Sequence, residues 1–356
     1  MLDSYGWSER LQQHFQPFAA RDMVPGRVTV QQRGRYRLAT PVGELDAELS
    51  GRFAHTAADG DFPVAGDWVA AAARASEGAA TIHHLLPRSS AFVRKTAGDT
   101  AAGQVVAANA DLAFLVASLN DDLNLRRIER YLALAWESGA APVVVLTKAD
   151  LCADVAAALD EVRSIAPGAE VLAVSSANGQ GLEALSALLG AGRTAVLLGS
   201  SGVGKSTLLN ALAGSELMAT QAIREDDARG RHTTTHRELV RLPSGGLLLD
   251  TPGMRELGLW NAGEGLASAF QDVEALAARC RFRDCGHHDE PGCAVQAALT
   301  GGELSDARWR NYQKLQRENA HHERRGDARA EAEARQVWIR RAKDYRAGKK
   351  ARERWS

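Results

Sequence analysis

Short runs of alternating apolar and polar residues fill the chain from about Gly26 to Leu86. Glycine, aspartate and proline separate these runs, which is the pattern of short, half-buried strands joined by turns. The runs are RVTVQQ, RYRLAT, GELDAELS, DWVAAAA and AATIHHLL. Five short strands within this length predict a small β-barrel. An OB-fold is favoured, although the strand count also fits an SH3-like barrel.

A different pattern follows, in which continuous apolar runs are separated by helical stretches. The segment KTAGDTAAGQVVAANA is expected to be a linker or loop between the two patterns. The apolar runs are ADLAFLVASL, APVVVLTKAD, AEVLAVSSA, TAVLLG, RELVRL and GLLLDTPG. Buried strands that alternate with helices predict an open α/β sheet.

After Leu257 the chain is expected to be helical and to end in a charged tail. We therefore expect a multidomain protein with a β-barrel, an α/β domain and an α-helical C-terminal domain. The expected boundaries are 1–95 for an N-terminal extension and the barrel, 96–265 for the α/β domain, and 266–356 for the C-terminal domain and tail.

Composition narrows the class of protein only slightly. The chain has 356 residues, of which 45% are hydrophobic, and a formal net charge of −1. Near-neutrality gives no overall attraction to nucleic acid or membrane, so any such contact has to come from a local patch. The sequence has neither a leader pattern nor an apolar run of about 18 residues. We expect a cytoplasmic protein, and we expect a monomer because no dimerisation signal is evident.

The segment GSSGVGKST has the G-x-x-x-x-G-K-[ST] spacing of a phosphate-binding loop, between an apolar strand and a predicted helix. Backbone N–H groups of such a loop, together with the helix N-terminus, face the phosphates. Lys205 is expected to reach the β- and γ-phosphates, and the Ser206 hydroxyl to bind Mg²⁺. The predicted residues of this loop are Gly199, Ser200, Ser201, Gly202, Val203, Gly204, Lys205, Ser206 and Thr207.

Two segments at strand ends indicate that the base is guanine. In TKAD, Asp150 can accept hydrogen bonds from both N–H groups on the guanine edge, and the stem of Lys148 can pack on the ring. In VSSAN, a backbone N–H could meet the guanine carbonyl. The predicted base-binding residues are Thr147, Lys148, Asp150, Ser175, Ser176 and Ala177.

The remaining GTPase segments lie after the phosphate loop. Asp250 of DTPG is expected to hold the Mg²⁺ shell, and the Gly253 N–H to sense the γ-phosphate. RHTTT, residues 231–235, is expected to supply a threonine, with Thr234 as the candidate, and to order when GTP binds. Because the base-reading segments precede the phosphate loop, the domain is predicted to be circularly permuted.

Three of the four cysteines crowd into one short polar stretch, in the pattern C-x₄-C-x-H-x₅-C. Cys280, Cys285, His287 and Cys293 would supply three thiolates and an imidazole to one tetrahedral Zn²⁺. Four protein ligands close the site, so the metal is expected to be structural. His288 is the alternative fourth ligand. Arg279, Arg281 and Arg283 are interleaved with these ligands in the sequence. They could face phosphate or solvent, and both interpretations stay open.

The motifs and their order resemble those of the ribosome small-subunit-dependent GTPase A family, RsgA. The resemblance rests on TKAD, GSSGVGKS, GRHTTTH, DTPGMREL and the cysteine spacing, and it covers nearly the whole chain. It implies an N-terminal OB-fold, a circularly permuted GTPase domain and a C-terminal zinc domain. It further implies GTP hydrolysis stimulated by the small (30S) ribosomal subunit during late maturation, with ribosomal RNA bound by the barrel and the zinc domain.

The position after D-x-x-G, where many GTPases have a water-orienting glutamine, is Met254, which has no suitable donor or acceptor. A low intrinsic rate of hydrolysis is therefore expected. Our hypothesis is that docking on the subunit brings His232 to the attacking water. A loop histidine without a catalytic part is the alternative for that residue.

Two other functions compete with a switch GTPase. The first is an RNA-binding scaffold that nucleotide merely locks in shape, with incidental turnover. The second is a permuted GTPase that acts on the large subunit or in another pathway. The tail beyond His321 carries more Lys and Arg than Asp and Glu, and it could dock on RNA or pack its aromatic residues on the GTPase domain.

Overall fold

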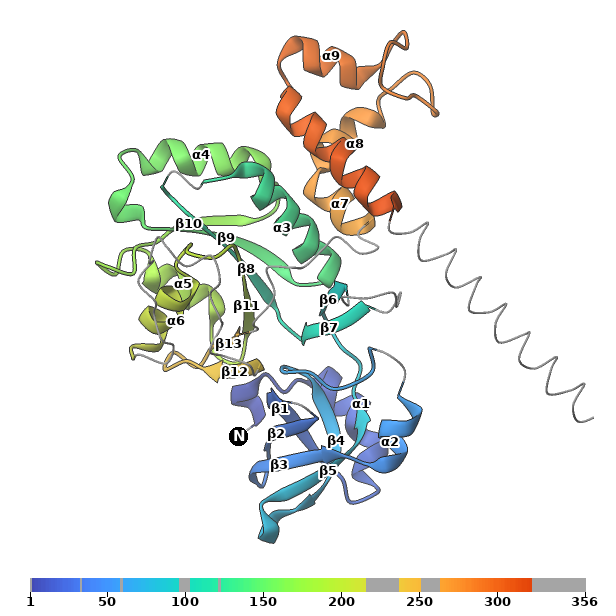
Figure 1. Cartoon of the computed structure of the whole chain (residues 1–356), viewed down its shortest axis with the longest axis vertical. Coiled ribbons are helices and arrows are strands. Elements are labelled where there is room, and N and C mark those ends of the chain that lie inside the picture. The colour runs from blue at the N-terminus through green and yellow to red at the C-terminus, as the bar shows by residue number, and fades with distance from the viewer. Residues whose placement is uncertain are drawn as a thin grey trace, which may run out of the picture.

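The computed structural model describes residues 2–32, 34–57, 60–95, 103–120, 123–215, 237–250 and 263–321. These residues form a barrel, a central α/β domain and a helical C-terminal domain along the long axis of the molecule (Figure 1). Within these ranges, no helix is both long and apolar enough to cross a membrane. The basic tail and the RHTTT segment lie outside the described residues.

The five predicted strands form a closed barrel. Their bounds are β1 Val24–Gln32, β2 Arg35–Thr40, β3 Gly43–Leu49, β4 Trp68–Arg74 and β5 Ala79–Leu85. The order is β1-β2-β3-β5-β4, and β4 pairs back with β1. Alternate residues such as Val28, Leu38 and Ile82 fill the interior, as the period of two requires. A five-stranded barrel closed in this order, with the short helix α2 (Gly51–Thr56) between β3 and β4, confirms the OB-fold expectation.

The N-terminal segment folds onto the barrel as a 3₁₀ helix, η1 (Leu2–Tyr5), and a helix, α1 (Glu9–Ala19). Ser8 begins α1, where its hydroxyl accepts a hydrogen bond from the N–H of Leu11. Leu11 and Phe15 are buried against Trp68 of β4, and the ring of Trp7 lies edge-on to that of Trp68 at 4.9 Å. Trp68 and Ala70 alternate with the interior residues Val69 and Ala71, so this cluster covers the face of β4 that points away from the barrel interior.

The expected linker between the two domains is not simply a loop. Its second half forms β7 (Gly103–Ala108), which pairs antiparallel with β6 (Ala91–Lys95). The expectation was wrong because the apolar run of β7 is short and is preceded by glycine and alanine, which obscured it. Phe92 and Val106 of this hairpin are buried in the main hydrophobic core.

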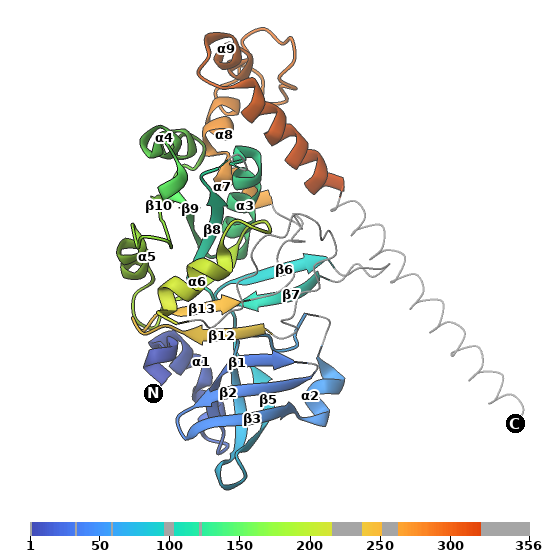
Figure 2. The ribbon, with the colours of Figure 1, turned by 60° about the vertical axis from the view of Figure 1, so that its left-hand side comes forward.

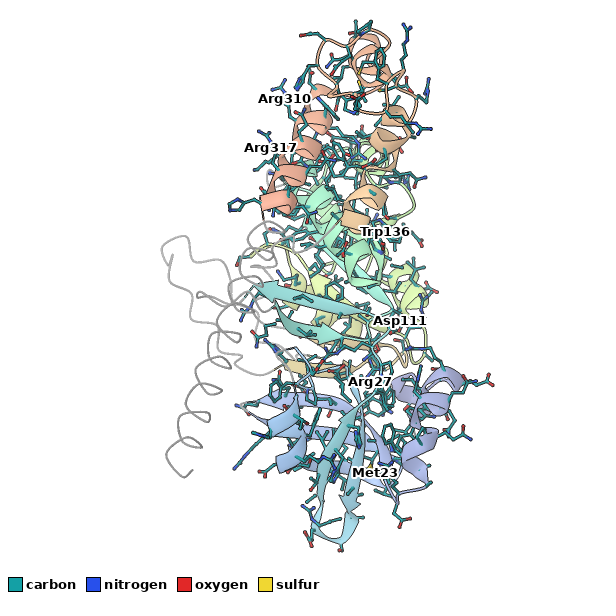
Figure 3. All side chains as sticks on the ribbon, turned by 90° about the vertical axis from the view of Figure 1, so that its right-hand side faces the viewer. Met23, Arg27, Asp111, Trp136, Arg310 and Arg317 are labelled. Atoms are coloured by element: carbon teal, nitrogen blue, oxygen red, sulfur yellow. The ribbon has the colours of Figure 1, made fainter. Side chains whose placement is uncertain are left out.

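A buried arginine joins the barrel to the central domain just beyond this hairpin (Figure 3). The Arg27 guanidinium donates to the carbonyl of Tyr5 at 3.2 Å, the carbonyl of Asn109 at 3.1 Å and the hydroxyl of Thr194 at 3.2 Å. Burial lowers the pKa of Arg27 to about 10, although Asp111 and Asp67 oppose this shift. One side chain therefore ties together the N-terminal segment, the domain junction and the central sheet.

The central domain is a sheet with helices on both faces. Its strands are β8 Leu112–Ser118, β9 Ala141–Thr147, β10 Glu170–Ala173, β11 Thr194–Leu198, β12 Arg237–Arg241 and β13 Leu247–Asp250. Helices α3 (Leu125–Ser138) and α4 (Val155–Ile165) cover one face, and α5 (Leu182–Leu189) and α6 (Lys205–Ala213) cover the other. The order is β10-β9-β8-β11-β13-β12, in which only β12 is antiparallel. This confirms the open α/β sheet.

The barrel and the central domain share one continuous sheet of eleven strands. Strand β12 pairs with β13 on one side and with β1 of the barrel on the other (Figure 2). In these registers Glu238 lies opposite both Val30 of β1 and Asp250 of β13. A single row of the sheet therefore runs from the barrel to the end of β13.

The C-terminal domain contains α7 (Gly263–Ala269), α8 (Gln271–Ala277), α9 (Ala294–Gly301) and a helix that is described from 306 to 321. Helix α7 packs closely on α3, since a Cβ atom on Gly265 would lie 2.2 Å from the carbonyl oxygen of Ala133. The N–H of Gly265 donates to Glu137 of α3 at 2.9 Å. Glycine at this position permits the close approach.

A buried ion cluster fixes the C-terminal domain on α3. The Arg308 guanidinium contacts both oxygens of Asp272 at 2.7 and 2.6 Å, and it also donates to Glu129 of α3 at 2.8 Å. Arg126 donates to the same Glu129 carboxylate at 2.6 Å, and Asn311 is a further partner. Glu129 is fully buried, so its charge depends on these donors for stabilisation.

We expect Arg308→Met to lower the free energy of unfolding by about 3 kcal/mol or more, because it leaves a buried carboxylate short of donors. Urea denaturation followed by tryptophan fluorescence measures this loss. Arg163→Met is the matched control, since the Arg163–Asp160 pair has side chains that are 56% and 76% exposed, and we expect a change within about 0.5 kcal/mol. Equal stability of the two variants would contradict the importance of the cluster.

Candidate functional site

The segment TKAD turns at the carboxyl end of β9. Thr147 is the last residue of the strand, and Lys148 adopts a left-handed conformation with φ of 58°, which lysine rarely does. Asp150 follows in a 3₁₀ turn, η3 (Ala149–Leu151), and is exposed. The N–H of Ala149 donates to the carbonyl of Val174 at 3.1 Å, so this turn is tied to the end of the next strand.

The two predicted base-reading segments meet at Asp150. The buried hydroxyl of Ser175 donates to the Asp150 carboxylate at 2.5 Å. The same hydroxyl accepts from the N–H of Ala177 at 3.2 Å. Ser176 is half-buried, and Ala177 is exposed beside it. An exposed carboxylate oriented by a buried serine is well placed to accept hydrogen bonds from a planar donor edge.

The phosphate loop curls between β11 and α6. A Cβ atom on Gly199 would lie 2.4 Å from the carbonyl oxygen of Val116, so only glycine permits this approach to β8. Gly202 and Gly204 have φ of 79° and 92°, and Gly204 begins α6. Ser201 and Gly202 are exposed, while Val203 is buried beneath them.

Lys205 is held by the loop itself. Its Nζ donates to the carbonyl oxygens of Gly199 at 2.8 Å and Ser200 at 2.5 Å. Ser206 and Thr207 follow in the first turn of α6 and are exposed. The loop thus combines an ammonium group, hydroxyls and a helix N-terminus, which are groups that suit anionic phosphate oxygens.

The base-reading and phosphate-binding segments are joined by a direct contact. The hydroxyl of Thr147 donates to the carbonyl of Val203 at 2.6 Å. The carboxyl ends of β9, β10 and β11 therefore bring segments that are distant in sequence to one edge of the sheet. Asp250 ends β13, two strands from β8 and next to β11. Gly253, Met254, His232 and Thr234 lie outside the described residues.

Sequence reasoning did not identify one residue of this region, Arg127 of α3. Its guanidinium donates to the hydroxyl of Ser200 at 2.7 Å. An arginine in an amphipathic helix carries no sequence signal that separates it from the neighbouring Arg126 and Arg130. The contact spans 73 positions along the chain, so only the fold reveals it.

The four predicted metal ligands converge in the C-terminal domain. The ligand atoms of Cys280, Cys285, His287 and Cys293 all lie within 4.8 Å of one another. The sulfurs of Cys280 and Cys293 are 3.9 Å apart, and His287 Nδ1 lies 3.5 and 3.6 Å from them. Zn–S bonds of about 2.3 Å place the sulfurs of a tetrahedral site about 3.8 Å apart. This Cys₃His group could therefore hold a metal ion.

The pKa values of the closely spaced thiols Cys280 and Cys285 are shifted in opposite directions. The pKa of Cys280 is lowered, because N–H groups of α9 and the neighbouring thiols outweigh the opposing effect of burial. Burial and the neighbouring Cys280 raise the pKa of Cys285 to about 11. Adjacent thiolates repel one another, so a bound divalent cation is what allows several of them to be charged together.

Contacts around the group hold its ligands in place. The Gln296 amide donates to the carbonyl of His287 at 2.7 Å, and the ring of Trp309 lies edge-on to His287 at 5.6 Å. His287 has a left-handed backbone with φ of 58°. His288 is not part of the group, and its N–H donates to Glu290 at 2.8 Å. Such supporting contacts are typical of metal sites.

Comparisons with known proteins agree with this architecture. The model of the RsgA GTPase family matches residues 85–260. The small ribosomal subunit biogenesis GTPase RsgA of Opitutus terrae is 48% identical over 366 residues, which cover 99% of this chain and 98% of that protein. The protein of the same name from Streptomyces avermitilis is 47% identical over 354 residues, which cover 99% of this chain and 94% of that protein.

Two solved structures share the fold. YjeQ from Thermotoga maritima has a TM-score of 0.62 and 26% identity, and the match covers 82% of this chain and 97% of that one. YloQ, a circularly permuted GTPase, has a TM-score of 0.59 and 24% identity over 82% of this chain and 93% of that one. The family match and the two relatives that align with 99% of the chain show that this chain belongs to the RsgA GTPase family.

Proposed function

We propose that this chain hydrolyses GTP to GDP and phosphate on the small ribosomal subunit and assists the late maturation of that subunit. The meeting of TKAD, VSSAN and the phosphate loop at one sheet edge is the observation that carries the proposal. Relatives that match 99% of the chain are named small ribosomal subunit biogenesis GTPases. This role implies a cytoplasmic protein, and we propose that it acts as a monomer.

The proposed nucleotide site uses the strand ends described above. The exposed Asp150 reads the guanine edge, with Ser175 orienting its carboxylate, while Lys148 covers the ring. Lys205 binds the β- and γ-phosphates, and Ser206 and Asp250 hold Mg²⁺. Thr147, Ser176, Ala177 and the loop from Gly199 to Thr207 complete the site, together with Gly253 at the γ-phosphate.

For the hydrolysis step, we propose that His232 orients the attacking water and that Thr234 closes on Mg²⁺ and the γ-phosphate. The absence of a glutamine after D-x-x-G, where Met254 stands, supports a low intrinsic rate. Strand β12 follows the RHTTT segment in the sequence and pairs with β1 of the barrel. A partner that binds the barrel can therefore act on the strand that directly follows this segment.

We propose Zn²⁺ as the ion of the Cys₃His group and ribosomal RNA as the partner of the barrel and the C-terminal domain. Three thiolates and an imidazole are ligands that suit zinc, and four protein ligands leave no open position for catalysis. Exposed Arg279, Arg281 and Arg283 lie beside the group, as does Phe282, whose side chain is 43% exposed. Exposed cations and an aromatic ring suit contacts with phosphates and bases.

We also propose functional domains with boundaries at residues 1–95, 96–265 and 266–356. The barrel strands β1–β5 lie within the first range, and β8–β13 lie within the second. The metal group and Arg308 lie in the third, while the β6–β7 hairpin and helix α7 cross the first and second boundaries.

The hydrolysis of GTP by the purified protein tests the proposal directly. We expect a slow intrinsic rate that rises by orders of magnitude when small subunits are added, because docking on the subunit is proposed to bring His232 to the attacking water. Large subunits and naked ribosomal RNA are the controls, added separately. A rate that no addition changes would favour the scaffold function, and stimulation by large subunits alone would place the enzyme in another pathway.

Asp150→Asn is expected to weaken GTP binding at least a hundredfold and to improve xanthosine triphosphate binding. The amide replaces one acceptor oxygen with a donor, which matches the carbonyl that xanthine carries in place of the guanine amino group. Competition binding measures the affinities of the variant for GTP and for xanthosine triphosphate. Asp160→Asn, an exposed change on α4, is the control, and unchanged GTP binding by Asp150→Asn would show that another residue reads the base.

The purified chain is expected to contain one zinc per molecule, as measured by elemental analysis. Cys285→Ser should lose most of this zinc and lower the melting temperature, because metal-binding energy stabilises the folded domain. Cys152→Ser, which changes a half-buried cysteine outside the group, should keep the zinc. Full zinc content in Cys285→Ser would exclude this cysteine as a ligand.

A further inference from the structure

Arg127 connects α3 to the phosphate loop, although it belongs to none of the GTPase motifs. It lies in the first turn of the helix, where the side chain of Asn124 accepts a hydrogen bond from its N–H at 3.1 Å. Its guanidinium donates to the Ser200 hydroxyl at 2.7 Å. Arg127, Ser200 and Val203 line the same small cleft between α3, β8 and the loop. The side chain therefore faces the loop and not the solvent-facing side of the helix.

Ser200 links Arg127 to the main phosphate-binding cation. The hydroxyl of Ser200 accepts from Arg127, and its carbonyl oxygen accepts from Lys205 Nζ at 2.5 Å. Lys205 is also bound by the carbonyl of Gly199 at 2.8 Å. Any movement of Ser200 therefore moves an acceptor that holds the Lys205 ammonium group in the loop.

The position of Arg127 is itself well fixed, because α3 is held along its length. Glu129 lies in the buried ion cluster with Arg308, and Arg130 pairs with Glu318 at 2.5 Å. Near the other end of the helix, Glu137 accepts from the N–H of Gly265 at 2.9 Å. The C-terminal domain thus holds α3 in place at three points, and Arg127 extends from that fixed helix to the loop.

We propose that Arg127 is a positioning residue that holds Lys205 in its phosphate-binding place through Ser200. This inference rests on the proposed GTPase function and adds a residue to its nucleotide site. The two loop carbonyls fix the direction of the Lys205 ammonium group. A charged group that is fixed in advance binds its ligand without the cost of ordering it.

The proposal predicts a selective effect on nucleotides that carry a β-phosphate. Lys205 reaches the β- and γ-phosphates in a loop of this type, whereas GMP has only the α-phosphate. Loss of the Arg127 contact should therefore weaken GDP and GTP binding and leave GMP binding unchanged. A variant that merely damaged the fold would weaken all of these nucleotides together.

The test is the equilibrium affinity of the full-length Arg127→Gln protein for GDP, GTP and GMP. We expect the affinity for GDP and GTP to fall about tenfold, as for the loss of a hydrogen bond to a charged group. GMP affinity should stay within a factor of two of wild type. Arg127→Lys should recover part of the loss, and Arg163→Gln, which changes an exposed arginine of α4, should bind all three nucleotides like the wild type.

Ser200→Ala and the double variant, which combines it with Arg127→Gln, test whether Arg127 acts through Ser200. If Arg127 acts through Ser200, the double variant should bind GDP no more weakly than the weaker single variant. Additive losses would show that Arg127 contacts the nucleotide or acts by another route, which would overturn the proposed positioning role. Equal losses for GDP and GMP, or no loss in Arg127→Gln, would also overturn it. A wild-type chain that binds no guanine nucleotide would instead contradict the proposed function.

Discussion

The buried carboxylate of Glu129 is the constraint on which the arrangement of the two C-terminal thirds of the molecule depends. A carboxylate that is fully removed from water is stable only when donors surround it, and here Arg126, Arg308 and Asn311 provide them. Two of these donors come from the C-terminal domain. Separation of that domain from α3 would remove two of the three donors of this carboxylate, so the contact between α3 and the Cys₃His domain is strongly favoured.

The barrel is attached by a different kind of interaction, the backbone pairing of β1 with β12. The register of such pairing is strongly specified, because a slip of one residue would turn the core-facing side chains of the strand to the other face. The row from Val30 through Glu238 to Asp250 is thus fixed in register. Arg27 reinforces the same junction, with three acceptors from three segments. Both flanking domains are consequently attached to elements that border the nucleotide site.

Much of this architecture could be predicted from the sequence, because it depends on local patterns. The barrel strands, the alternation of strands and helices, and the convergence of the cysteines each follow from spacing within short segments. The contacts that join the domains could not be predicted in this way. Arg308 and Glu129 are 179 positions apart, and Gln31 and Arg237, whose side chains bond at 3.0 Å, are 206 apart. Charged residues on amphipathic helices and strand ends are usually exposed, so nothing local marks those that are buried in an interface.

Helix α3 occupies the position where these constraints meet. One of its sides faces the phosphate loop through Arg127, and another faces the C-terminal domain through Glu129 and Arg130. In an α-helix each residue is rotated by about 100° from the one before it, so Arg127 and Glu129, two positions apart, point in nearly opposite directions and one rigid element can contact both neighbours at once. Residues 139–198 separate the helix from the loop in the sequence, so packing joins them. The C-terminal domain contacts the helix and the helix contacts the loop, so a series of direct contacts connects the metal-binding domain with the phosphate site.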